Sequence, residues 1–293
     1  MTFINVVRSD LRNGVAKRWV PFLFVGILFV TLAFFAYLDF DAAQRMNPSP
    51  ITTPVTLGDY LLYLFGGTSS GNHPFEFIDE NNIVNSLFIF TFPSIWILVF
   101  LVLLLLTLQY PYEDLMGFGK TIIILSKKTH YWWISKCIWV IVSVVLYFSI
   151  AFICYSVTAI ILGAEPSLNI GTYYPYFRFT SADFITEPPW NIVPTLSMVI
   201  PVGIGLCLIQ LTTSLITSRL YSYLLSSAFL IASAYMQHEI LFPNVSMFAR
   251  SINAVTNGQY AILELIVIAW FSSMSILAGY IYLDKADIIN KHR

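Results

Sequence analysis

The sequence predicts an all-α polytopic membrane protein, a single transmembrane domain over residues 1–293 with an N-terminal amphipathic elbow helix and six transmembrane helices. Hydrophobic residues make up 57% of the chain and charged residues only 11%, whereas soluble domains usually contain about 25% charged residues. The apolar residues also gather in runs that are long enough to cross a bilayer core of about 30 Å at 1.5 Å per helical residue. The predicted spans cover residues 20–38, 87–108, 137–163, 196–218, 220–237 and 261–283.

The basic residues predict the orientation of these spans. Twelve of the fifteen Lys and Arg residues lie before the first span, between the second and third, between the fourth and fifth, or after the sixth. The other connections hold one basic residue each, Arg45, Arg178 and Arg250. Because connections rich in Lys and Arg stay in the cytoplasm, we expect both termini to be cytoplasmic. Residues 39–86, 164–195 and 238–260 are then extracytoplasmic.

Residues 1–19 are predicted to form the interfacial elbow helix. One stripe of this helix is apolar and consists of Phe3, Ile4, Val7, Leu11 and Val15. The opposite stripe is polar or basic and consists of Asn5, Arg8, Ser9, Arg12 and Asn13. A basic amphipathic helix lies in the headgroup plane, and Trp19 and Pro21 mark the turn into the bilayer. The alternative is a positively charged flank that only sets the topology.

The three outer connections differ in composition. The first, residues 39–86, is broken by Pro and Gly but carries an apolar patch that predicts one short helix over Leu57–Phe65. The second, residues 164–195, is rich in aromatic residues, which suit either a membrane interface or an outer vestibule. The third, residues 238–260, is too apolar for a solvated loop. We predict two short helical segments that re-enter the outer leaflet, with Phe242, Pro243 and Phe248 in this hairpin.

The inner connection, residues 109–136, combines charged residues with an apolar stretch at 121–125. Its candidate docking residues are Glu113, Asp114, Gly117, Lys120, Lys127 and Lys128. An apolar face with charged flanks is suited to docking on a protein, and the alternative is an ordinary loop on the inner leaflet. The Gly-Lys-Thr sequence at 119–121 is not a phosphate-binding loop, because Asp114 stands where the first glycine is required.

We expect no catalytic motif and no metal site in this chain. The first outer connection clusters His73, Glu76, Asp79 and Glu80, but without a second His or a Cys, so we interpret it as a solvated acidic loop. Glu264 is the only acid inside a predicted span, and we expect it to reach headgroups or water from the outer end of the sixth span.

In the order of its elements, nearly the whole chain resembles the permease subunit of a type-2 ATP-binding-cassette exporter. The shared layout is an elbow helix, six spans, an inner loop of the acid-Gly-Lys-Leu-Lys type, a re-entrant connection between the fifth and sixth spans, and a short charged tail. The residues that carry the inner-loop resemblance are Asp114, Gly117, Lys120, Leu125, Lys127, Lys128 and Lys136. The two long outer connections depart from the compact members of the family.

The resemblance implies that residues 109–136 form a coupling segment that rests in a groove of a separately encoded cytoplasmic ATPase. Two permease chains, identical or different, would enclose the pathway, and ATP and Mg would bind to the ATPase. This chain would then catalyse no reaction, hold no cofactor and bind no nucleic acid, and would lie in the lipid bilayer of a bacterial plasma membrane. The alternatives are a secondary transporter and a structural or accessory subunit that transports nothing, and peptide, lipid and drug cargoes all remain open.

Overall fold

The computed structural model describes residues 3–46, 54–68, 93–117, 119, 129–171, 190–252, 254 and 258–285. Its long helices are α1 (Phe3–Gly14), α2 (Trp19–Met46), α4 (Ser94–Met116), α6 (Thr129–Ile161), α8 (Val193–Ile216), α9 (Arg219–Tyr235) and α10 (Ala261–Lys285). Shorter elements are η1 (Ala16–Arg18), α3 (Leu57–Phe65), η2 (Phe242–Ser246) and η3 (Phe248–Arg250), with a strand pair formed by β1 (Asn169–Ile170) and β2 (Trp190–Asn191).

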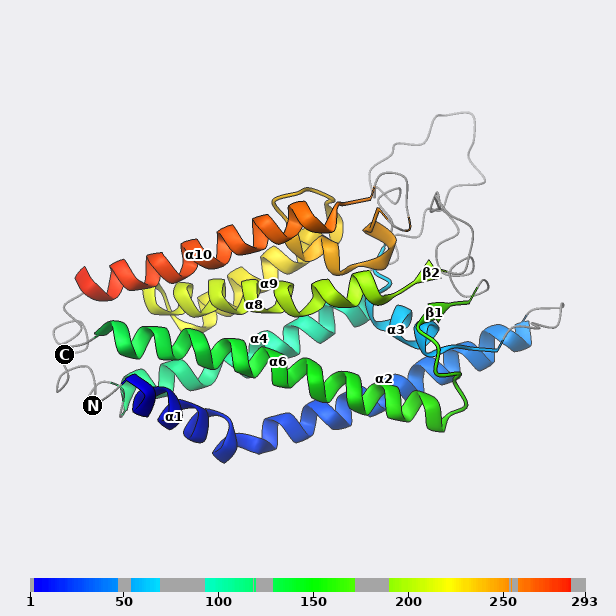
Figure 1. Ribbon diagram of the computed structural model, residues 1–293, viewed down its shortest axis with the longest axis horizontal. Helices are drawn as coiled ribbons and strands as arrows, with labels where there is room; N and C mark the ends of the chain where they lie inside the picture. The colour runs from blue at the N-terminus through cyan, green and yellow to red at the C-terminus, as the bar shows by residue number, and fades with distance from the viewer. Residues whose placement is uncertain are drawn as a thin grey trace.

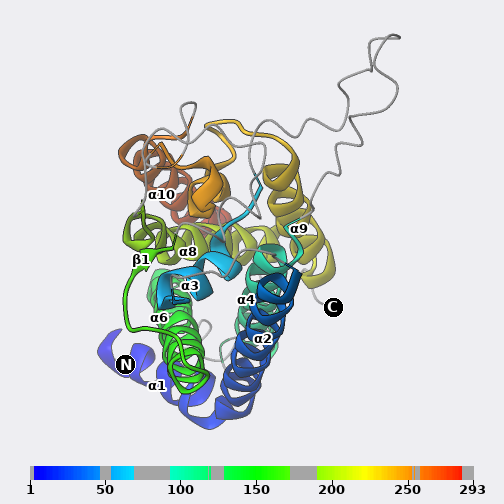
Figure 2. The ribbon, with the colours of Figure 1, turned by 90° about the vertical axis from the view of Figure 1, so that its right-hand side faces the viewer.

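The helices from α2 to α10 run side by side as an elongated bundle (Figure 1). The elbow helix α1 and the last turn of α10 lie at one end, which we call the elbow end, and α3, the strand pair, η2 and η3 lie at the other, which we call the hairpin end (Figure 1). Viewed along the bundle, α8 occupies the centre (Figure 2), where it contacts α4, α6, α9 and α10. It is the most buried of the apolar helices, whereas α10 is the least buried.

Among the described residues, five helices are long and apolar enough to cross a membrane, counting α1, η1 and α2 as one continuous unit, so the fold fits a membrane-embedded helical protein. The fifth predicted span, 220–237, corresponds to α9, which has 17 residues and is therefore about 25 Å long. The span count and the side on which the termini lie remain predictions.

Several helices continue beyond the predicted spans. Helix α2 extends to Met46, α4 extends to Met116, and α6 begins at Thr129, so the inner connection 109–136 is helical at both of its ends. Hydropathy detects the part of a helix that suits the membrane core, whereas backbone hydrogen bonding can continue into water. The first residues of the second predicted span, 87–92, lie outside the described residues.

At the hairpin end, α3 has the bounds that the sequence predicts. Thr56 caps its first turn: the Thr56 hydroxyl accepts a hydrogen bond from the Asp59 amide, and the Asp59 carboxylate accepts one from the Thr56 amide. The carboxylate also accepts the Gly171 amide at 2.9 Å, which ties α3 to the β1 strand. The all-α prediction missed the two-stranded antiparallel sheet, in which Asn169 pairs with Asn191.

The connection between α9 and α10 folds back on the bundle as two short helical segments, η2 and η3, as predicted. Segment η2 packs against α8, α9 and α10, and Phe242 and Phe248 are 0% and 1% exposed. Arg250 holds this hairpin in place: its guanidinium donates to the carbonyl oxygens of Thr68 (3.0 Å) and Ala234 (2.6 Å). A flexible solvated loop would not bury these groups, so the hairpin is part of the core.

Candidate functional site

The candidate site lies at the elbow end, where α1 packs across α6 (Figure 1). The buried residues of α1 are Val6, Asp10 and Gly14, which are spaced one helical turn apart. Gly14 allows the closest approach, because a Cβ there would lie 2.3 Å from Trp139 Nε1. Within the predicted apolar stripe, Ile4 is 73% exposed, and the face of α1 that packs on the bundle contains Asp10.

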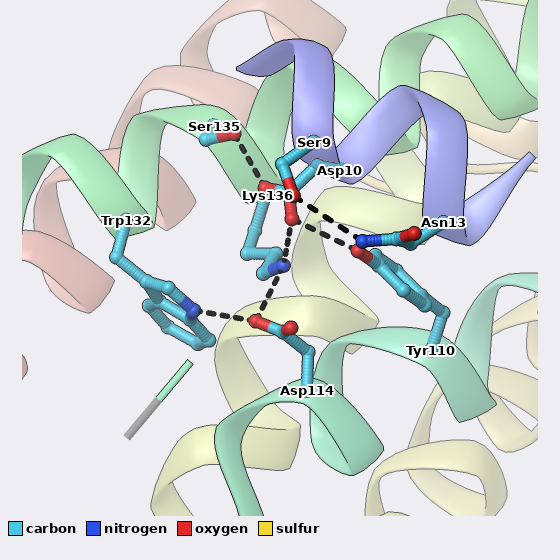
Figure 3. Close-up of polar contacts among 8 residues, drawn as sticks. All are labelled: Ser9, Asp10, Asn13, Tyr110, Asp114, Trp132, Ser135 and Lys136. Atoms are coloured by element: carbon cyan, nitrogen blue, oxygen red, sulfur yellow. Dashed lines mark hydrogen bonds and ion pairs between the residues drawn. The ribbon is translucent and has the colours of Figure 1, made fainter. Parts of the chain in front are cut away.

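Asp10 belongs to a buried ionic cluster that joins three helices (Figure 3). Lys136 of α6 places its Nζ 2.6 Å from Asp10 Oδ1 of α1 and 2.7 Å from Asp114 Oδ2 of α4. The side chains are 0%, 6% and 12% exposed for Lys136, Asp10 and Asp114. One ammonium group therefore bridges the elbow helix and the end of α4 in the absence of bulk water. We call these three residues the elbow cluster.

Neutral donors complete the coordination of both carboxylates (Figure 3). Tyr110 donates its hydroxyl to Asp10 Oδ1 at 2.9 Å, and Trp132 donates its indole N–H to Asp114 Oδ2 at 2.8 Å. Ser135 donates its hydroxyl to Asp10 Oδ2. The Lys136 ammonium also lies 4.6 Å from the centre of the Tyr110 ring, within the range of a cation–π interaction. The buried charges thus have partners of the kind that burial requires.

The formal charge of the elbow cluster is one negative charge, from two carboxylates and one ammonium. Tyr110, Trp132 and Ser135 stabilise the excess charge by hydrogen bonds to its carboxylate oxygens. A cluster of this kind specifies one arrangement of α1, α4 and α6, because sliding any of the helices would separate buried charges from their partners.

A second ion pair lies beside the elbow cluster but is open to solvent. Arg18 of η1 binds Glu113 of α4, and the two side chains are 38% and 36% exposed. Gln109 also donates to the Glu113 carboxylate at 2.7 Å. The same region reaches α9, because the Arg219 guanidinium lies 4.1 Å from the centre of the Tyr112 ring.

The predicted docking residues fall into three groups. Asp114 turns inward to Lys136, whereas Glu113 remains on the surface. Gly117 ends α4, and its amide donates to the carbonyl oxygen of Glu113 at 3.0 Å. The remaining predicted docking residues, Lys120, Lys127 and Lys128, lie outside the described residues. Gly119 packs against Asp114, since a Cβ at Gly119 would lie 2.4 Å from the Asp114 carboxylate.

The predicted hairpin residues Phe242, Pro243 and Phe248 are all buried at the opposite end of the bundle. The hairpin that contains them and the elbow helix α1 lie at opposite ends of the bundle (Figure 1). Among the described residues, the two groups of predicted site residues therefore lie at opposite ends of the bundle, one at the end of α4 and the other in the packed hairpin.

The sequence analysis missed Asp10 and Lys136 as site residues. Asp10 is the only acid in residues 1–38, so it was an unusual residue in an otherwise basic segment. Lys136 immediately precedes an apolar run, and it was counted as a topology signal and as part of the inner-loop resemblance, but not as a site residue. An isolated acid in a basic elbow helix and a lysine at the start of a span were the available signals, but neither identifies its partner, because the pair is separated by 126 residues.

The expectation of no catalytic motif needs one correction. Residues 67–71 read Gly-Thr-Ser-Ser-Gly, which matches the Gly-x-Ser-x-Gly pattern of serine hydrolases. That pattern is functional in a turn from a strand to a helix, whereas helix α3 precedes this match and ends at Phe65. Within the described residues, no group of three or more His, Cys, Asp or Glu side chains could hold a metal ion.

No family model, no curated protein and no solved structure matches the chain.

Proposed function

We propose that this chain is the permease subunit of an ATP-binding-cassette exporter, in which segment 109–136 docks on a separate ATPase. The observation that carries the proposal is the elbow cluster, because it joins the elbow helix to both helices that flank this segment. Helix α4 enters the segment as far as Met116, and α6 leaves it from Thr129. A partner that moves the segment therefore acts directly on two long helices.

In this proposal, the elbow cluster couples the movements of α1, α4 and α6 where these helices meet. A displacement of α4 relative to α6 would pull Asp114 away from Lys136, and a displacement of α1 would expose Asp10. Both changes leave a buried charge without its partner, which typically costs about 3 to 5 kcal/mol. Movement of the docking segment is thus transmitted to α1, α4 and α6 together, as a rigid-body switch between two packed states requires.

The surface pair of Arg18 and Glu113 supports a docking role for the same region. Both side chains are partly exposed, so a partner protein can reach them without opening the elbow cluster. Exposed pairs contribute little to stability, about 0 to 1 kcal/mol, so exchanging one of these charges changes recognition more than folding. Glu113 is therefore a sharper probe of docking than Asp114, which the fold itself uses.

Copurification tests the proposal. An affinity-tagged chain, extracted in mild detergent, should retain a soluble ATPase that carries a Walker A motif, and Glu113→Lys should reduce the retained ATPase. Glu165→Lys is the matched control, because Glu165 is an exposed carboxylate whose backbone pairs with Val55 and Leu57 beside α3, at the hairpin end. The absence of any ATPase from the purified wild-type chain would refute the proposal, as would equal retention by the Glu113→Lys variant.

A secondary transporter is the second candidate function, and one residue favours it. Glu264 in α10 is 1% exposed, whereas the sequence analysis expected it to reach headgroups or water. Buried carboxylates inside apolar helices are common in ion-coupled carriers. Transport into sealed vesicles that follows an imposed ion gradient without ATP would favour this second function, and dependence on ATP would favour the exporter.

A further inference from the structure

A cavity of about 380 Å³ lies at the hairpin end, at the start of α10. It is bordered by residues 237–239, which follow α9, by residues 258–260, and by Leu263 and Glu264 of α10. Gly258 lets the chain pass close to its neighbours, because a Cβ there would lie 2.3 Å from the Ile252 amide nitrogen. The backbone is therefore folded tightly around this cavity, which is open on one side.

Polar atoms with no hydrogen-bond partner line this cavity. Glu264 is 1% exposed, and its Oε2 accepts no hydrogen bond from any described residue. Gln259 is 8% exposed, and both Nε2 and Oε1 of its side chain lack a partner among the described residues. Buried polar atoms without partners destabilise a fold in general, so such a group in a native fold calls for an explanation. A ligand with complementary groups would provide one.

The charged groups around the cavity favour a cation. Glu239 and Glu264 contribute two carboxylates, and no Lys or Arg is among the described lining residues. The Nδ1 atom of His238 accepts a hydrogen bond from the Ile240 amide at 3.2 Å, so this nitrogen already has a partner within the chain. Tyr260 adds an aromatic ring to the lining, which is a further favourable neighbour for an ammonium group.

The unpaired hydrogen-bonding atoms of the cavity further limit which cations could bind there. A primary ammonium group has three donors and no acceptor, which suits the unpaired oxygens of Glu264 and Gln259. The unpaired Gln259 Nε2 is a donor and needs an acceptor. A single small molecule that carries a primary ammonium group beside a hydroxyl or ether oxygen meets both requirements.

We propose that this cavity binds a small organic cation with a primary ammonium group next to an oxygen acceptor, of the ethanolamine type. Glu264 and Gln259 contact the ammonium and oxygen groups, and Glu239 stabilises the charge from the open side. The proposal is independent of the ATPase partner, since it depends only on the residues at the hairpin end.

Isothermal titration of the purified full chain with ethanolamine hydrochloride tests the site. We expect saturable binding with a Kd of about 0.1 to 10 mM, because a ligand of so few atoms has little binding energy available. Glu264→Gln and Glu239→Gln should each weaken the affinity, Glu264→Gln by at least about tenfold, whereas ethylene glycol, the uncharged analogue, should not bind. Glu165→Gln, which alters an exposed carboxylate outside the cavity, should bind like the wild type.

Three results would overturn the proposal. They are the absence of saturable ethanolamine binding, an unchanged affinity in both cavity variants, or equal binding of ethylene glycol. Because Glu239 is exposed, Glu239→Gln keeps the test valid even if Glu264→Gln fails to fold. Titrations in nanodiscs identify the source of the ligand: weaker ethanolamine binding in phosphatidylethanolamine than in phosphatidylcholine assigns the site to a lipid headgroup, and equal binding assigns it to a free amine. Both of these outcomes support the ammonium site.

Discussion

Replacing Lys136 by methionine is expected to destabilise the protein more than any comparable change at a surface lysine. Methionine keeps most of the length of the side chain but removes the only cation in the elbow cluster. The formal charge of the cluster changes from one to two negative charges, and Asp10 and Asp114 are left buried beside each other. Tyr110 and Trp132 continue to donate their hydrogen bonds, so the loss is mainly that of the bridging charge.

The expected size follows from the burial of the partners. Removing one member of a buried ion pair typically costs about 3 to 5 kcal/mol, because the remaining charge is desolvated and unpaired. At about 2 °C per kcal/mol for a chain larger than 150 residues, the melting temperature should fall by about 6 to 10 °C. Asp10→Asn changes the charge of the same cluster from minus one to zero, so its effect should be smaller, about 1 to 2 kcal/mol.

Thermal unfolding of the detergent-purified protein, followed by intrinsic fluorescence, measures these differences. Lys17→Met is the matched control, because Lys17 is an exposed lysine in η1 that lies close to Asp10 along the chain but is not part of the elbow cluster. We expect its melting temperature to stay within about 1 °C of the wild type, as for most surface substitutions. Equal losses in Lys136→Met and Lys17→Met, or a larger loss in Asp10→Asn than in Lys136→Met, would refute the charge-based account of the elbow cluster.

Three further predictions concern the hairpin end. Phe248→Ala should destabilise the protein by about 3 to 5 kcal/mol, because Phe248 is 1% exposed. The control Ile240→Ala should change the melting temperature little, because Ile240 is 56% exposed. Equal effects of the two substitutions would show that the hairpin is not packed. Arg250→Lys should cost about 2 kcal/mol or more by the same assay, because an ammonium cannot replace the guanidinium fork that reaches Thr68 and Ala234, and an unchanged melting temperature would contradict this. Burial raises the pKa of Asp59 above its ordinary value of 3.8 despite the hydrogen bonds that it accepts. The stability that Asp59 contributes is therefore full below its unfolded pKa and is lost as the pH rises through its folded pKa. The melting temperature of the wild type relative to that of Asp59→Asn should be higher in acid than at neutral pH. A difference that does not change with pH would contradict this.

The parts of the fold that the sequence predicted are those fixed by local signals. The short helix at 57–65 was predicted at its observed bounds because an apolar patch stands between Pro and Gly residues, and the Thr56 cap defines its start. The two helical segments of the hairpin followed from the same logic, because an apolar connection broken by Pro243 cannot remain a solvated loop.

The parts that the sequence did not predict depend on contacts between distant residues. Asp10 and Lys136 meet only because α1 folds back across α6, and helical periodicity alone cannot select which stripe of α1 faces another helix rather than lipid. The burial of Glu264 has the same origin, since its cavity is assembled from residues 237–239 and 258–260 as well as α10. The sequence analysis assumed that charges near the ends of apolar runs lie at the membrane surface. Packing against neighbouring helices instead buries some of them.

Photocrosslinking from the docking segment tests the central claim most directly. A photoreactive amino acid at position 126, within segment 109–136, should crosslink in intact cells to a cytoplasmic ATPase that carries a Walker A motif, and one at position 70 should not. For the same reason, a single cysteine at position 126, with Cys137, Cys154 and Cys207 replaced by alanine, should resist impermeant thiol reagents added from outside, whereas one at position 70 should react. Crosslinks to an ATPase from position 126 alone are the predicted result. External labelling at position 126, or crosslinks from there only to lipid or extracytoplasmic proteins, would contradict the account.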